Sequence, residues 1–281
     1  MAAPSQSSAT PIYFQQTMSP ATTSPTTIMR PTPVVRRHNF PTPLLRLEFR
    51  DLAHEGASIF LSNIHGNEDL EAQVQNVLNL LYDSPEASPL HDKRPGTRSV
   101  TFIVREFDGV AYTTGLDLDD DHKEIHINAQ YIRRCAQGGD KRHELLGVIC
   151  HELVHCFQWS AGGSCPGGLT EGIADWVRLR AGLGAAHWRQ EASGGWDGGY
   201  QKTGYFLEWL EQKFGDGLVR KINACLRKGK YDQTKLFGDC CDGERVEDLW
   251  KMYQKELEKK EGGHGDEDAP ANPLPTHPAK E

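Results

Sequence analysis

"ICHELVHCFQWS", residues 149–160, holds two histidines four residues apart, with a glutamate directly after the first. In an α-helix, residues four apart lie on the same face, so His151 and His155 can aim both imidazoles at one zinc ion. Glu152 is turned about 100° from His151, which places it beside the open side of such a metal rather than among its ligands. From there it can take a proton from a zinc-bound water. The stretch therefore predicts a helix with two zinc ligands and a general base.

The helix that would carry this motif is apolar on nearly every side. Its apolar residues are Leu145, Leu146, Val148, Ile149, Leu153, Val154 and Phe157. Burying two histidines and a glutamate among them without partners would be costly, and a metal ion would relieve that cost. Because HExxH is short and also arises by chance, the prediction needs a third ligand.

The third ligand is predicted sixteen residues further on. The extended motif HExxHxxGxxH is excluded, because Gln158 and Ala161 stand where it requires glycine and histidine. In "GGLTEGIADWVRLRAG", residues 167–182, Glu171 follows a glycine-rich reversal and can supply a carboxylate from the next helix. Asp175 shares the helix face of Glu171, so it can accept a hydrogen bond from the second ring nitrogen of a zinc-bound histidine. The alternative is that both acids are solvated residues, which are favoured at the start of a helix.

Five segments resemble the plant basic secretory protein family of zinc peptidases. They are "GVAYTTG" (109–115), "EIHINAQYI" (124–132), "GVICHELVHCFQW" (147–159), "PGGLTEGIADWVRLRAGL" (166–183) and "WDGGYQKTGYFLEWLE" (196–211). The resemblance covers most of residues 44–259 and implies a gluzincin-like fold. It also implies His151, His155 and Glu171 as zinc ligands, with Glu152 as the catalytic base. Plant members are typically secreted and basic, whereas this chain is acidic and shows no signal peptide.

Secondary candidates surround the motif. Tyr200, Tyr205 and His187 follow the second of the two predicted ligand helices and could stabilise an oxyanion. Tyr200 is the preferred candidate because it ends the glycine-rich "GGWDGGY" (194–200); the alternative is that it starts a helix and packs. An edge strand formed by 109–115 or 123–132 can pair with the backbone of a substrate. His126 is predicted as a solvent-facing strand residue, and "DLDDD" (117–121) as a hairpin turn rather than a calcium loop.

The periodicity of the chain predicts one α+β domain with a mixed sheet, the HExxH helix and a helical C-terminal part, and the resemblance implies that this domain has a zincin-like fold. Expected strands are 44–51, 99–107, 109–115 and one beginning at 123–132. Expected helices are 69–83, 141–159, 168–182, 200–214, 216–228 and 244–259. The domain is predicted to span 44–259. The Pro/Ser/Thr-rich leader 1–43 and the tail 260–281 are expected to be disordered.

The net charge and the length of the apolar runs argue against some classes of function. A net charge of −8 argues against a nucleic-acid or anionic-membrane binder, and no apolar run is long enough to span a bilayer. Without a classical signal peptide, a monomer in the cytoplasm is the default expectation, with mitochondrial or secreted locations as alternatives. The sequence thus predicts a zinc metallopeptidase, an endopeptidase with one Zn²⁺ per chain that acts on peptides or proteins. The alternative is a non-catalytic, zinc-stabilised binding or defence-related protein of the same family.

Overall fold

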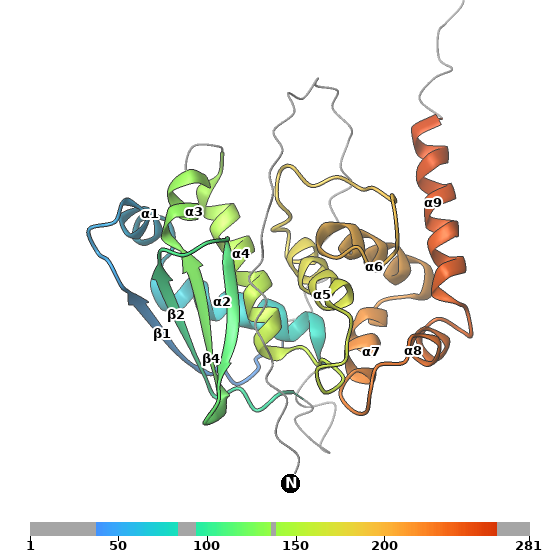
Figure 1. The fold of residues 1–281 in the computed structure, drawn as a ribbon, viewed down its shortest axis with the longest axis horizontal. Helices are drawn as coiled ribbons and strands as arrows, with labels where there is room; N and C mark the ends of the chain where they lie inside the picture. The colour runs from blue at the N-terminus through green and yellow to red at the C-terminus, as the bar shows by residue number, and fades with distance from the viewer. Residues whose placement is uncertain (1–37, 84–93, 136–138, 263–281) are drawn as a thin grey trace, which may run out of the picture.

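The computed structural model describes residues 38–83, 94–135 and 139–262, which form a four-stranded sheet and a larger set of helices (Figure 1). The strands are β1 (Leu44–Phe49), β2 (Ser99–Arg105), β3 (Ala111–Leu116) and β4 (Asp119–Asn128). Within the described residues the helices are α1 (Glu55–Asn63), α2 (Gly66–Leu81), α3 (Ala129–Cys135), α4 (Lys141–Phe157), α5 (Gly167–Arg180), α6 (Tyr200–Phe214), α7 (Leu218–Cys225), α8 (Gln233–Cys240) and α9 (Val246–Gly262). This architecture confirms the α+β prediction.

The sheet has the strand order β1-β2-β4-β3. Strands β1, β2 and β4 run parallel, and β3 pairs antiparallel with β4 at the edge of the sheet. In this register Thr113 lies opposite Ile125, and Tyr112 lies opposite His126. Ile125 is fully buried. Because side chains alternate along a strand, Thr113 shares the buried face of Ile125, whereas Tyr112 lies on the other face.

Helix α2 packs mainly against α4 and also against β1, and its buried side is the apolar one that its period predicts. Leu70, Val74, Val77, Leu78 and Leu81 are all buried. Residues just before β1 also lie against this helix. The side chain of Gln75 accepts a hydrogen bond from Phe40 N at 3.0 Å and donates one to Phe40 O at 2.8 Å.

Helix α4 is fixed at both ends. At its start, the carboxylate of Asp140 accepts a hydrogen bond from His143 N at 3.0 Å, as an N-cap does. At its end, the free carbonyls are satisfied from other elements: Tyr82 donates to Phe157 O, and Thr97 donates to Cys156 O at 2.7 Å. The helix is therefore held in one position between the sheet and the remaining helices (Figure 1).

Helices α5 and α6 approach each other closely because small residues lie where they touch. A Cβ on Gly172 would lie 2.3 Å from Thr203 Cγ2, and one on Gly204 would lie 3.2 Å from Trp176 N. Beyond α6, helices α7, α8 and α9 complete the helical half, whose aromatic core includes Trp196, Phe206 and Trp250.

Two local expectations hold in part. The segment 123–132, predicted to begin as a strand, leaves the sheet at Asn128, whose side-chain oxygen accepts a hydrogen bond from Gln130 N at 2.9 Å and so starts α3. Of the segment 117–121, predicted as a hairpin turn, residues 117 and 118 form the turn and the three aspartates begin β4.

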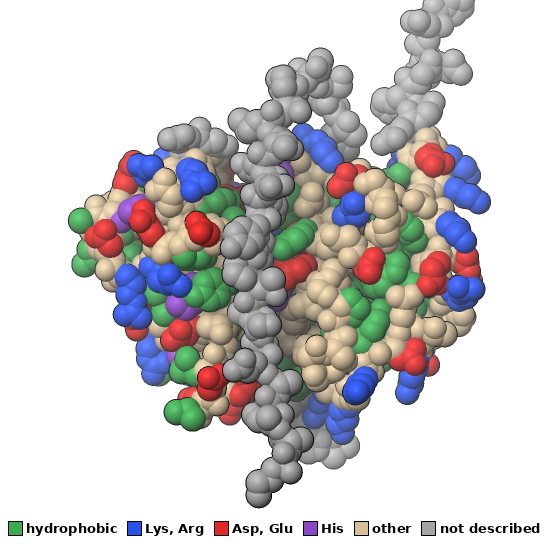
Figure 2. Space-filling view, viewed as in Figure 1, with side chains coloured by type: hydrophobic (Ala, Val, Ile, Leu, Met, Phe, Trp, Pro, Cys, Tyr) green, Lys and Arg blue, Asp and Glu red, His purple; other side chains and the backbone are tan. Residues whose placement is uncertain are grey.

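Most of the leader and tail predicted as disordered, residues 1–37 and 263–281, lies outside the described residues. Within the described part, no helix combines the length and apolar character needed to cross a membrane. On the face drawn in Figure 2, acidic and basic side chains are interspersed over both the sheet half and the helical half.

Candidate metal centre

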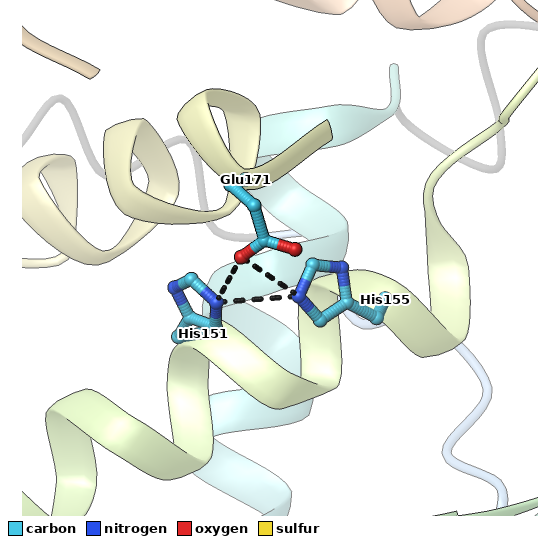
Figure 3. Close-up of side chains that lie close together, drawn as sticks. All are labelled: His151, His155 and Glu171. Atoms are coloured by element: carbon cyan, nitrogen blue, oxygen red, sulfur yellow. Dashed lines mark hydrogen bonds and ion pairs between the residues drawn. The ribbon is translucent and has the colours of Figure 1, made fainter. Parts of the chain in front are cut away.

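Two imidazoles and one carboxylate converge between α4 and α5 (Figure 3). His151 and His155 lie on α4 with their Nε2 atoms 3.2 Å apart. Glu171, near the start of α5, places its Oε2 3.1 Å from His151 Nε2 and 3.7 Å from His155 Nε2. The structure thus brings together the three residues that the sequence predicts as metal ligands.

The three donor atoms have the spacing of ligands around a zinc ion. Zinc–nitrogen and zinc–oxygen bonds of about 2.0–2.2 Å at tetrahedral angles place two ligand atoms roughly 3.3 Å apart. The observed separations of 3.1, 3.2 and 3.7 Å bracket that distance. Two histidines and a carboxylate are also the protein ligands of many zinc hydrolases, whose fourth position stays open. The residues present therefore fit a zinc ion with an open side.

Asp175 lies behind His151, one helical turn after Glu171. Its Oδ1 is 2.6 Å from His151 Nδ1, and its side chain is buried. A carboxylate at this place accepts the Nδ1–H bond and leaves Nε2 free to face the cluster. The predicted role of Asp175 as an acceptor for a ligand histidine has the geometry that it requires.

The charges around His151 favour a proton or another cation at this point. Burial disfavours the protonated imidazole, but the carboxylates of Asp175 and Glu171 outweigh burial and raise the pKa of His151 to about 10. For Glu171, burial disfavours ionisation, but hydrogen bonds with His151 and His155 outweigh it and lower the pKa of this carboxyl. The carboxylates of this centre therefore stabilise a positive charge on or beside the imidazoles.

Glu152 lies apart from the three-residue cluster. Its side chain is buried, and its Oε2 accepts a hydrogen bond from Thr113 Oγ1 at 2.7 Å. Thr113 comes from the edge strand β3, and its hydroxyl also lies 3.0 Å from Glu152 O. The carboxylate of Glu152 is thus oriented from the sheet, beside the ligands rather than among them.

Tyr200 opens α6 in a left-handed backbone conformation, with φ of 48°. This conformation is rare for a bulky residue and is found where surrounding contacts impose it. Its ring lies nearly parallel to that of His151, with the ring centres 6.3 Å apart. Burial raises the pKa of the Tyr200 hydroxyl, and the carboxylate of Glu171 adds to that rise, so the group stays protonated.

The loop that brings Tyr200 to the centre is hydrogen-bonded to α6 and lies close to α5. The Thr203 hydroxyl donates to Trp196 O at 2.8 Å and accepts from Gly199 N at 2.9 Å. Gly199 has φ of 83°, and a Cβ there would lie 3.5 Å from Gly168 Cα. The glycines of "GGWDGGY" therefore permit the close approach to α5 that the sequence suggested.

Other sequence candidates lie elsewhere. His187, an alternative oxyanion donor, is exposed, whereas Tyr205 is buried on α6. His126 was expected to face solvent but is buried, because its ring stacks on Tyr112 and accepts a hydrogen bond from Arg105 Nε at 3.0 Å. Among the described residues, His126 belongs to no group of three potential metal ligands.

Two residues of the centre were not recognised from the sequence. Thr113 lies in a segment that was named only as a possible edge strand, and strand alternation alone does not say which face meets the helix. Gln158 was considered only as a departure from a longer zinc motif. Its side-chain nitrogen lies 2.7 Å from His155 Nδ1. The signal that could have revealed Gln158 is its position three residues after His155, a helical neighbour.

Comparison with known proteins bears on this centre. A family model described as a peptidase of plants and bacteria, BSP, matches residues 42–253, which include the cluster, Glu152 and Tyr200. Neither a curated protein nor a solved structure matches the chain. The match spans well over half of the chain and agrees with the resemblance to the basic secretory proteins. The chain therefore belongs to the BSP family of peptidases of plants and bacteria.

Proposed function

We propose that the protein is a zinc-dependent metallopeptidase with a zincin-like fold, and that His151, His155 and Glu171 hold one zinc ion. The observation that carries this proposal is the spacing of the three donor atoms, 3.1, 3.2 and 3.7 Å, on two adjacent helices. Membership of a peptidase family supports peptide or protein as the substrate.

Each residue has a distinct part in hydrolysis. A bound zinc ion would polarise the scissile carbonyl and acidify the attacking water. Glu152 accepts a proton from that water and then donates it to the leaving amine. Thr113 keeps the Glu152 carboxylate oriented for this transfer through the 2.7 Å hydrogen bond. Tyr200, which stays protonated, donates a hydrogen bond to the oxyanion that forms at the carbonyl.

The edge of the sheet offers a place for the substrate backbone. Strand β3 pairs with β4 on one side, and no other described strand pairs with its outer side. An extended peptide can add to such an edge through main-chain hydrogen bonds. Because Thr113 of this strand touches Glu152, a peptide alongside β3 would pass the base with chain on both sides of the scissile bond. This placement supports an endopeptidase.

The test combines metal content with cleavage of an unfolded protein substrate. The wild type should contain one zinc per chain, and His151→Ala or Glu171→Ala should lose it while remaining folded. Glu152→Gln should keep zinc and lose at least a factor of about 10² in cleavage rate, the lower end of what general acid–base catalysis contributes. Zinc-free wild-type protein would contradict the ligand set.

The same variants also test the alternative function, a non-catalytic zinc protein. In that case zinc would bind but wild type and Glu152→Gln would be equally inactive on every unfolded substrate. A purely structural zinc site normally has four protein ligands, whereas among the described residues this cluster has three and a buried carboxylate beside it. The geometry therefore favours catalysis.

A further inference from the structure

The second ring nitrogen of His155 needs its own partner if His155 binds a metal. A histidine that ligates through Nε2 carries its proton on Nδ1, and that proton requires an acceptor. For His151 the acceptor is Asp175. For His155, the side-chain amide of Gln158 lies 2.7 Å from Nδ1. This neighbour lies at the end of the same helix and is 9% exposed.

The amide of Gln158 can present either of its ends to His155. Its nitrogen faces Nδ1, an arrangement suited to an unprotonated Nδ1, and its oxygen has no hydrogen-bond partner among the described residues although it is buried. A half-turn of the amide would place the oxygen where it can accept the Nδ1–H bond. The side chain is thus already at the distance that the zinc-binding tautomer of His155 requires.

The main chain at Gln158 is fixed by α7 and by the end of α4. Gln158 N donates to Val154 O at 2.7 Å, and Trp159 N donates to the side chain of Asn223 at 2.9 Å. Asn223 is fully buried on α7. Two residues later, Ala161 N donates to Leu226 O at 2.8 Å. The amide is therefore carried by a backbone with little freedom to move away from His155.

We propose that Gln158 is the positioning residue for His155: its side-chain oxygen accepts the Nδ1–H bond and fixes the tautomer that presents Nε2 to a zinc ion. This inference rests on the proposed metal centre. Together with Asp175 on α5, Gln158 gives each ligand histidine its own acceptor.

The test is a zinc titration against a competing chelator, with folding checked by circular dichroism. Gln158→Met keeps the length but removes the acceptor, so zinc affinity should fall by about 10–100-fold, the usual loss when such a partner is removed. Gln158→Glu keeps an acceptor and should bind zinc at least as tightly as the wild type. The control is Gln73→Met on α2, which removes a buried amide that is hydrogen-bonded to Asn76 rather than to a cluster residue and should leave zinc affinity unchanged.

The outcomes separate this inference from the proposed function. Wild-type protein that binds no zinc overturns both. Wild-type affinity in Gln158→Met, or an equal loss in Gln158→Glu, overturns the role of Gln158 alone. If Gln158→Met does not fold, nitrogen NMR of the zinc-loaded wild type replaces it. A protonated His155 Nδ1 bonded to the Gln158 oxygen is expected there, and an unprotonated Nδ1 contradicts the inference.

Discussion

Two adjacent glycines at the start of α5 have opposite surroundings. A Cβ on Gly168 would lie 1.8 Å from Asp197 O and 2.7 Å from Asp197 C, both backbone atoms of the loop that leads to Tyr200. A Cβ on Gly167 would meet nothing within 4 Å. Alanine at these two positions should therefore change stability in opposite directions.

The expected magnitudes follow from these distances. In Gly168→Ala, the methyl group would lie about 1.5 Å inside ordinary contact, so either the loop or the first turn of α5 must move. Overpacking of this kind costs about 1–3 kcal/mol, or more where backbone must shift. Gly167→Ala removes backbone freedom from the unfolded chain without a clash and should gain about 0.5–1 kcal/mol.

Thermal unfolding measures both effects. For a domain of this size, each kcal/mol shifts Tm by about 2–4 °C, so Gly168→Ala should melt at least about 2 °C below the wild type and Gly167→Ala should melt at or above it. Because the loop carries Tyr200 and the turn carries Glu171, Gly168→Ala should also lose zinc affinity and cleavage rate. Gly167→Ala should keep both.

One result would refute the reasoning about this contact. If Gly168→Ala were as stable and as active as Gly167→Ala, the loop before Tyr200 would not be seated against α5. The position of Tyr200 beside His151 would then have no support from this side, and its proposed role at the oxyanion would have to be abandoned.

Three further predictions concern other parts of the chain. Asp175→Ala should weaken zinc binding about 10–100-fold in a folded protein, measured by chelator competition; unchanged affinity would return this residue to a purely structural role. Thr113→Val keeps the shape of the side chain but frees the Glu152 carboxylate, so it should lower kcat while zinc content stays at one per chain; an unchanged kcat would show that the base needs no orientation from β3. Trimming to 38–262 should preserve the unfolding free energy, whereas trimming to 44–260 removes the buried Phe40 and should cost about 1.5–3 kcal/mol in denaturant unfolding. Equal stability of the two truncations would show that Phe40 contributes nothing.

The elements of the fold that could be predicted from the sequence are those in which an apolar periodicity extends over several turns or a local motif marks the element. Helices α4, α5 and α6 repeat apolar residues over several turns, and the predicted range 200–214 coincides with α6. The spacing of residues on two of these helices, α4 and α5, was enough to predict that the three candidate ligands lie together. The helices α1, α3 and α8 were not predicted, because each spans nine residues or fewer and owes its stability to tertiary contacts.

The parts of the site that the sequence did not predict depend on contacts between distant segments. Glu152 and Thr113 are 39 residues apart, and their hydrogen bond depends on β3 being the edge strand whose buried face meets α4. Tyr200 has a left-handed backbone, which is rare for a bulky residue, and no local pattern in the sequence predicts it. Gln158 lies three residues after His155, so helical spacing makes a contact between them possible, but only the structure shows that its amide reaches His155 Nδ1.

The charge at the centre explains why the HExxH motif in an apolar helix was informative. The carboxylates of Glu152, Glu171 and Asp175 surround two imidazoles in a place with little access to water. A proton on His151, favoured by its pKa of about 10, compensates one of these negative charges. A metal dication held by His151, His155 and Glu171 would compensate two of them and would displace that proton. Because uncompensated buried charge opposes folding, a metal ion bound at this cluster would also stabilise the fold.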